Sequence, residues 1–160
     1  MATTLDFLKH LLKHEVTFVV VGGMAGVLHG SRLVTEDLDV CAPLTQENLS
    51  RICDALRHLH PRFRMSPNRP PLPDQPAALN GFRNLYLITD MGQIDILSEI
   101  AGVGGFAETL CHAVTVELGG MSCKVLDLDA LIRSKRALGR PRDLQAAVEL
   151  EAIRARRMGG

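Results

Sequence analysis

Hydrophobic residues in the first third of the chain recur every three to four positions, which is the spacing of an amphipathic helix. Apolar side chains over 5–12 follow Thr4, so the pattern predicts a helix that is capped by this threonine. A second apolar stripe covers 49–56 and predicts a helix that begins after Thr45. The N-terminal part of the chain is therefore expected to supply two helices that bury one face each.

Short runs of β-branched and aliphatic residues predict strands between and after these helices. The run 18–21 ends at Gly22-Gly23, which is typical of a buried strand that stops at a tight turn. Four more strands are expected in two hairpins, formed by 85–89 with 93–97 around Asp90-Met91-Gly92 and by 114–118 with 121–126 around Gly119-Gly120. These elements predict an α+β fold, a mixed twisted β-sheet flanked by helices that lie mainly on one face.

The length of 160 residues suits a single domain, 1–160, with a core over about 16–126 and C-terminal helices over about 129–157. The segment 61–81 holds six of the eight prolines and is not expected to form regular structure for long. It is interpreted as a flap beside the functional site or as a plain connecting loop.

The glycines that follow the first strand are the first candidate for function. Gly22 and Gly23 would let the backbone approach a ligand closely, and the free N–H groups of a following helix over 24–29 would face it. Such a turn suits a phosphate group. Taken alone, a glycine pair after a strand is more often explained by ordinary turn chemistry than by a phosphate site.

Two acidic residues come next in an apolar strand. Asp37 and Asp39 are two positions apart and therefore project to the same face, while Leu38 and Val40 pack behind them. Two neighbouring negative charges are tolerated where a divalent cation neutralises both, and Mg²⁺ prefers one or two carboxylates supplemented by water and phosphates. A solvated strand end is the alternative interpretation.

A third acid strengthens the metal hypothesis. Asp95 lies within an apolar strand, where a carboxylate is costly unless it is paired or bound to a metal. Three convergent acids can hold two metal ions about 4 Å apart, and Asp95 would also serve as the general base for an attacking hydroxyl. This arrangement points to phosphoryl or nucleotidyl transfer.

In this order, the motifs resemble the DNA polymerase β-like nucleotidyltransferase superfamily, and within it the small bacterial nucleotidyltransferases that include the transferase toxins of toxin–antitoxin systems. The resemblance covers about 16–151. It matches the glycine turn to Gly22 and Gly23, the metal ligands to Asp37, Asp39 and Asp95, and two residues that precede the acids to Arg32 and Thr35. It therefore implies a nucleotidyltransferase-like fold and a nucleotide site.

Two helices near the C-terminus carry the rest of the resemblance. The first is predicted over 130–138, capped by Asp127 or Asp129, and contains Lys135. The second begins near Arg140-Pro141-Arg142-Asp143, where a proline and an acid suit a first helical turn. Similar transferases carry a lysine and an Arg-Pro-x-Asp motif here, so Lys135 and Arg140 are expected to contact the triphosphate. Capping by Asp143 and plain solvation of Arg140 are the structural alternatives.

Composition limits the partners and the compartment. The formal net charge is zero and no tryptophan occurs, so no domain-wide positive field and no evident stacking platform indicate a nucleic-acid partner. The four cysteines lack C-x-x-C spacing, as in reduced cytoplasmic proteins. Neither a signal peptide nor a membrane-spanning run is recognisable, and a cytoplasmic protein is expected.

The sequence thus predicts a nucleotidyltransferase that uses Mg²⁺ or Mn²⁺ to move a nucleoside monophosphate from an NTP such as ATP to a hydroxyl acceptor, with release of pyrophosphate. RNA, a protein and a small molecule all remain possible acceptors. A homodimer or an antitoxin-like partner would complete the cleft. The alternatives are a non-catalytic nucleotide-binding or partner-binding module on the same fold and a metal-dependent glycosyltransferase.

Overall fold

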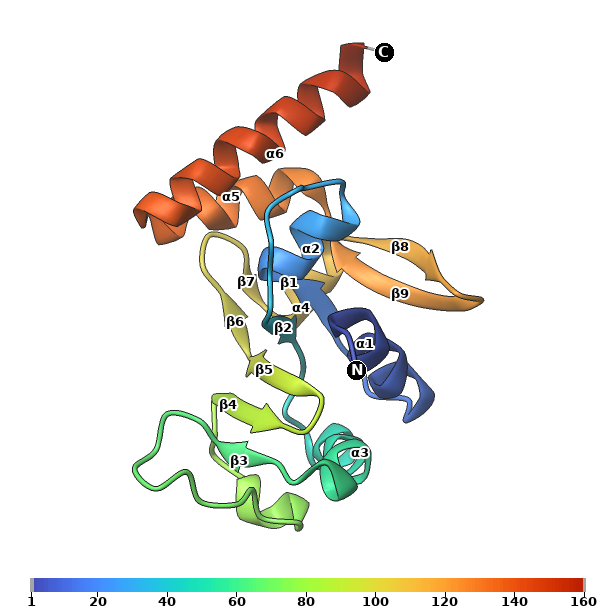
Figure 1. Cartoon of the computed structure of the whole chain (residues 1–160), viewed down its shortest axis with the longest axis vertical. Helices are drawn as coiled ribbons and strands as arrows, with labels where there is room; N and C mark the ends of the chain where they lie inside the picture. Colours follow the sequence, from blue (N-terminus) through green and yellow to red (C-terminus); the bar gives the residue numbers. More distant parts are fainter. Residues whose placement is uncertain (1, 160) are drawn as a thin grey trace.

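The computed structural model describes residues 2–159, which form one mixed β-sheet with helices packed around it (Figure 1). The helices are α1 (Thr4–Lys13), α2 (Gly22–Leu28), α3 (Gln46–Leu56), α4 (Phe106–Cys111), α5 (Leu128–Leu138) and α6 (Pro141–Gly159), with 3₁₀ turns η1 (Arg57–Leu59) and η2 (Pro76–Leu79). The strands are β1 (Val19–Val21), β2 (Leu38–Cys41), β3 (Arg62–Phe63), β4 (Asn84–Thr89), β5 (Gly92–Leu97), β6 (Glu99–Ile100), β7 (Gly104–Gly105), β8 (Ala113–Leu118) and β9 (Met121–Leu126). The α+β class predicted from the sequence is confirmed.

The main sheet has seven strands in the order β3-β4-β5-β2-β1-β9-β8, and β6 pairs only with β7. Its two parallel pairs are β1 with β9 and β2 with β5, and its other neighbours are antiparallel. Both hairpins predicted from the sequence, β4–β5 and β8–β9, are present. The parallel pairing of β2 with β5 brings two strands that are far apart in the sequence side by side.

Side-chain caps fix where the helices begin. Thr3, not Thr4, caps α1: its hydroxyl accepts a hydrogen bond from the N–H of Asp6, and the Asp6 carboxylate accepts one from the N–H of Thr3. Thr45 caps α3 as predicted. Asp127, rather than Asp129, caps α5, because its side chain accepts the N–H of Ala130 at 2.7 Å.

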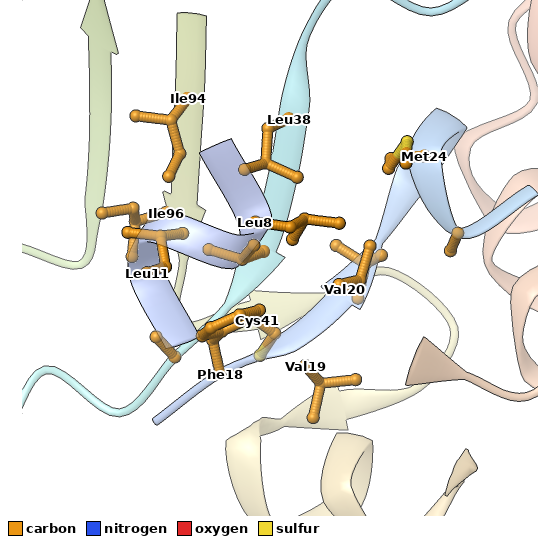
Figure 2. Close-up of a cluster of buried hydrophobic side chains, with 14 of the residues drawn as sticks. Leu8, Leu11, Phe18, Val19, Val20, Met24, Leu38, Cys41, Ile94 and Ile96 are labelled. Carbon is orange, nitrogen blue, oxygen red and sulfur yellow. The ribbon is translucent and has the colours of Figure 1, made fainter. Parts of the chain in front are cut away.

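The hydrophobic core lies on one face of the central strands. Leu38 on β2 packs with Ile94 and Ile96 on β5, and Leu8 and Leu11 of α1 cover them (Figure 2). All five side chains are at most 1% exposed. Because successive strand residues alternate between faces, the burial of these positions turns the intervening acids on β2 and β5 to the opposite face.

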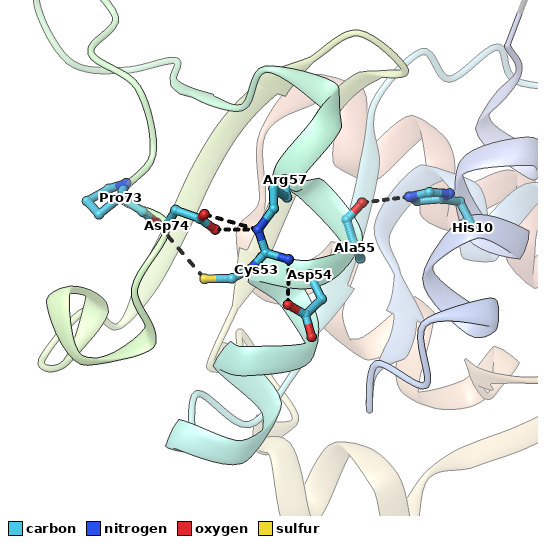
Figure 3. Close-up of polar contacts among 7 residues, drawn as sticks. All are labelled: His10, Cys53, Asp54, Ala55, Arg57, Pro73 and Asp74. Atoms are coloured by element: carbon cyan, nitrogen blue, oxygen red, sulfur yellow. Dashed lines mark hydrogen bonds and ion pairs between the residues drawn. The ribbon is translucent and has the colours of Figure 1, made fainter.

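The proline-rich segment between α3 and β4 is an ordered connector that completes the sheet. Its strand β3 forms the sheet edge, and the backbone N–H of Phe63 donates to Pro70 O at 2.9 Å. Arg57 joins the segment to α3: its guanidinium contacts Asp54 at 2.8 Å and both oxygens of Asp74 at 3.1 and 3.0 Å (Figure 3). The sequence left open whether this segment is a flap or a connector, and these contacts favour the connector.

Helices were expected mainly on one face of the sheet, with the acids in an open cleft on the other. Residues of α1, α2, α3, α5 and α6 all belong to one hydrophobic core. Residues at the start of α2 and on α5 and α6 also line the cavities around the acids, so helices border this cleft. In residues 2–159, no helix is long and apolar enough to cross a membrane.

Candidate active site

Two of the three predicted acids are direct neighbours in the sheet. Asp39 on β2 and Asp95 on β5 are register partners in the parallel pair, and Tyr86 on β4 is the register partner of Asp95 on its other side. Asp37 lies just before β2 and is exposed, whereas Asp39 is half-buried. The sheet therefore places Asp39, Asp95 and Tyr86 in one row across three strands.

The two glycines form the beginning of α2, so the helix starts two residues earlier than the sequence predicts. Gly22 has φ +65°, and a Cβ at this position would collide with the Asp39 carboxylate. A Cβ on Gly23 would lie 2.7 Å from Oγ1 of Thr35. The glycine pair is therefore required because the backbone of α2 meets the side chains of the 30–39 segment without any intervening space.

Asp39 occupies an electrostatically unfavourable position for a carboxylate. Burial, followed by the negative charge of Asp95, raises the pKa of Asp39 to about 6, and Asp37 acts in the same direction. The positive charges of Lys135 and Arg64 oppose this shift without cancelling it. A cation bound beside Asp39 would favour the charged form of this carboxylate.

Two adjoining cavities meet at these acids. The first, about 240 Å³, lies between the start of α2, the 31–37 loop and α6; the second, about 390 Å³, lies between β4, β5, β6 and α5. Both are lined by the same six residues, Gly22, Asp37, Asp39, Lys135, Arg140 and Arg142. Gly23 and Thr35 line only the first, and Asp95 and Tyr86 line only the second. The shared acids therefore stand between two separate spaces, each large enough for part of a ligand.

The basic residues predicted near the C-terminus lie at this junction and are held by a buried acid. Asp143, 1% exposed, accepts hydrogen bonds from Arg140 Nε at 2.5 Å and from the Arg140 backbone N–H at 3.3 Å. Lys135 Nζ lies 3.8 Å from the same carboxylate. Burial alone would raise the pKa of Asp143, but the hydrogen bonds and charges of Arg140 and Lys135 outweigh it and lower the pKa. Asp143 therefore joins the first turn of α6 to the Arg140 backbone and positions the two cations.

Arg32 is the one predicted site residue that lines neither cavity. The Arg32 side chain is exposed. Its backbone N–H donates a hydrogen bond to Glu149 Oε2 at 3.0 Å and so helps to hold the loop that precedes the acids. Glu149 also accepts a hydrogen bond from Ser31 Oγ at 2.5 Å. Sequence reasoning missed Glu149, because nothing in the pattern of α6 distinguishes it from Glu151, the other partly buried glutamate of that helix.

Arg64 is the second residue that sequence reasoning missed as a site residue. It follows β3 and forms an ion pair with Asp95, in which both side chains are only 19% exposed. Its guanidinium also lies 5.8 Å from the centre of the Tyr86 ring. The sequence shows a basic cluster at 62–64, but only the pairing of β3 with β4 reveals that the cluster reaches the acids.

The donor set suits a hard divalent cation. Asp37 and Asp39 offer carboxylate oxygens, which Mg²⁺ and Mn²⁺ prefer, and a bound cation would offset the burial and the neighbouring negative charges that raise the pKa of Asp39. Within residues 2–159, however, no three acidic, histidine or cysteine side chains are arranged to hold one ion. The convergence of Asp95 with the other two acids on metal ions therefore stays a prediction.

Comparisons with known proteins support the fold. Neither protein-family models nor curated proteins give a significant match. Among solved structures, the chain is similar to a protein from Thermotoga maritima that is provisionally described as a nucleotidyltransferase, with a TM-score of 0.56 and 18% sequence identity. The match covers 90% of this chain and 87% of the other. The chain therefore has a nucleotidyltransferase-like fold.

Proposed function

We propose that this protein is a metal-dependent nucleotidyltransferase, which transfers a nucleoside monophosphate from an NTP to a hydroxyl acceptor and releases pyrophosphate. The observation that carries the proposal is the position of Asp37 and Asp39 at the junction of two cavities. One cavity offers backbone N–H groups and cations that suit a triphosphate, and the other contains a carboxylate that suits an acceptor hydroxyl. A transferase needs such a pair of spaces, because two substrates must meet at one phosphorus atom.

The first cavity suits the triphosphate. Gly22 and Gly23 begin a helix whose first N–H groups have no helical partners, and Thr35 adds a hydroxyl. Lys135 and Arg140, aligned by Asp143, supply positive charge at the point where the two cavities join. Asp37 and Asp39 would hold Mg²⁺ or Mn²⁺, which would neutralise the phosphate oxygens and the leaving pyrophosphate.

The second cavity suits the acceptor. Arg64 contacts Oδ1 of Asp95, and the hydrogen bonds of the described residues leave Oδ2 free. In the proposed reaction, the acceptor hydroxyl gives its proton to Asp95 and its oxygen bonds to the α-phosphorus. The bond from that phosphorus to the bridging oxygen breaks, and pyrophosphate leaves with the electron pair. RNA, a protein and a small molecule remain the candidate acceptors, and toxin-type activity with an antitoxin-like partner is part of this proposal.

A labelling experiment tests the proposal directly. Purified protein is incubated with each α-³²P-labelled NTP, Mg²⁺ or Mn²⁺, and either total RNA or a protein extract, and both labelled acceptor and pyrophosphate are measured. We expect transfer to depend on the metal and to fall to background in Asp37→Asn and Asp39→Asn. Asp90→Asn, in the exposed β4–β5 turn, is the matched control and should retain activity. Substantial transfer by both site variants, with folding confirmed by circular dichroism, would sink the assignment.

A further inference from the structure

Asp95, the third acid of the two-metal site expected from the sequence, already pairs with a positively charged side chain of the protein. Asp95 lies between Asp39 and Tyr86 in the row across the sheet, and its Oδ1 pairs with Nη2 of Arg64. Arg64 follows directly on the edge strand β3, and its side chain crosses over Tyr86, with the guanidinium 5.8 Å from the ring centre. Positive charge is therefore fixed on the side of Asp95 away from Asp39.

Several contacts hold Arg64 in place. Its backbone N–H donates to Tyr86 O at 2.9 Å, which extends the pairing of β3 with β4 by one residue. Its Nη1 contacts Sδ of Met65 at 3.3 Å, and its Nε is fully buried and without a hydrogen-bond partner. Burial of a guanidinium nitrogen without a partner is costly and is tolerated here beside the Asp95 carboxylate. The Arg64 side chain is therefore held within the site and is not free to move in solvent.

The segment that carries Arg64 is itself anchored. Phe63 donates its backbone N–H to Pro70, and its ring stacks on Phe82 with centroids 5.6 Å apart. Leu72 is buried and donates its N–H to Pro61 O at 2.9 Å. These contacts on both sides of the turn fix the path of the chain at residue 64.

We propose that the site binds a single divalent cation, on Asp37 and Asp39, and that the Arg64 guanidinium takes the place of a second ion beside Asp95. This inference rests on the proposed function and replaces the two-metal site that was expected from the sequence. It agrees with the absence, in the described part of the chain, of any three side chains arranged to hold a metal. Arg64 then supplies permanent positive charge at the acceptor end of the reaction, where charge develops as the new bond forms.

Counting bound Mn²⁺ tests this inference without measuring activity. Free Mn²⁺ is followed by electron paramagnetic resonance during titration of the protein with saturating α,β-methylene NTP, and nucleotide binding is measured separately by calorimetry. We expect one Mn²⁺ per chain in the wild type. Arg62→Ala is the matched control, because Arg62 lies two residues away on β3, is exposed, and its side chain donates a hydrogen bond to the backbone O of Arg69. It should also bind one.

Removal of the guanidinium should open a second metal position. Arg64→Ala is expected to bind two Mn²⁺ ions, and the double variant with Asp95→Asn should bind one again. Asp95→Asn alone tests the idea in case Arg64→Ala fails to fold, and it should keep one ion, because Asp95 is not a ligand in the wild type. Two ions in the wild type, an unchanged count in folded Arg64→Ala, or no ion in Asp95→Asn would each overturn the inference. Nucleotide binding without any Mn²⁺ would overturn the metal requirement of the proposed function as well.

Discussion

Asp39 and Asp95 face each other as register partners on parallel strands, although 55 residues separate them in the chain. The apolar residues on either side of each acid are buried in the core. Because side chains alternate between the two faces of a strand, both acids must project from the opposite face of the sheet. Each acid has a different neighbour on its far side. Asp39 meets the backbone of Gly22, and Asp95 meets Arg64. The two carboxylates thus share one row but have distinct electrostatic environments.

Asp39→Asn should stabilise the metal-free protein at neutral pH. The pKa of Asp39 is raised from an ordinary 3.8 to about 6, so between these values the folded state keeps a proton that the unfolded state has released. The free energy of unfolding of the wild type therefore falls as the pH rises through this window, by on the order of 2 to 3 kcal/mol. The wild type remains less stable by this amount above pH 6. Asparagine does not titrate, so the free energy of unfolding of Asp39→Asn does not fall in this window.

Urea denaturation of both proteins between about pH 4 and pH 8 measures this difference. The stability advantage of Asp39→Asn should be smallest at the acidic end and reach its full size above about pH 6. An advantage that stays constant across the range would contradict the electrostatic explanation. Greater stability combined with lost transfer would also separate the functional role of Asp39 from any role in folding.

Gly22→Ala should destabilise the protein for two separable reasons. Alanine at φ +65° costs about 1 kcal/mol, and the new Cβ collides with the Asp39 carboxylate, which adds about 1 to 3 kcal/mol. A double-mutant cycle with Asp39→Ala separates these costs, because that change removes the carboxylate, whose Oδ2 would lie 2.3 Å from the new Cβ. We expect Gly22→Ala to be much less harmful in the Asp39→Ala background. Equal costs in both backgrounds would show that the close approach is not responsible.

The sequence predicts the central strands and both hairpins well because their burial is local and periodic. Val19 to Val21 end at glycines, and the turn at Asp90-Met91-Gly92 carries the conformation its residues favour. Errors of one or two residues occur where caps compete. Thr3 and Thr4 are both good N-caps, and only the reciprocal bond with Asp6 selects Thr3.

The candidate site was less accessible from the sequence because its geometry depends on pairing between distant segments. The acids could be predicted because the apolar residues that mark them as unusual are their immediate neighbours in the sequence. Arg64 and Glu149 were missed because their partners, Asp95 and Ser31, lie 31 and 118 residues away. Only sheet order and helix docking bring such pairs together.

Asp143→Asn should weaken both the fold and nucleotide binding. The pKa of Asp143 is lowered in the folded state, so the charged carboxylate contributes stability above its ordinary pKa, and this stability is lost as the pH falls through the lowered value. Asparagine cannot balance the cations, and a cost of about 1 to 3 kcal/mol is expected at neutral pH. Asp129→Asn is the control, because its pair with Arg154 at 3.0 Å is exposed and should be worth less than about 1 kcal/mol.

Kinetics distinguish the positioning role of Asp143 from its structural role. Lys135 and Arg140 lose their alignment in Asp143→Asn, so we expect the KM for NTP to rise about tenfold, at temperatures where the variant is fully folded. The Asp129→Asn control should leave KM unchanged. A fall in the amount of active protein, with KM preserved in the remainder, would show that Asp143 serves only the fold.

Glu149→Ala should impair nucleotide binding with little effect on stability. Glu149 holds the 30–37 loop against α6 through Ser31 Oγ and the backbone N–H of Arg32, and its pKa is lowered chiefly by the Ser31 hydrogen bond. The loop carries Thr35 and Asp37 to the first cavity, so its release should raise the KM for NTP by roughly tenfold. Glu149→Gln keeps one acceptor oxygen and should be intermediate. Glu151→Ala, two residues along the same helix and paired with Arg136, should match the wild type in KM, and an equal effect of both changes would assign the defect to α6 as a whole.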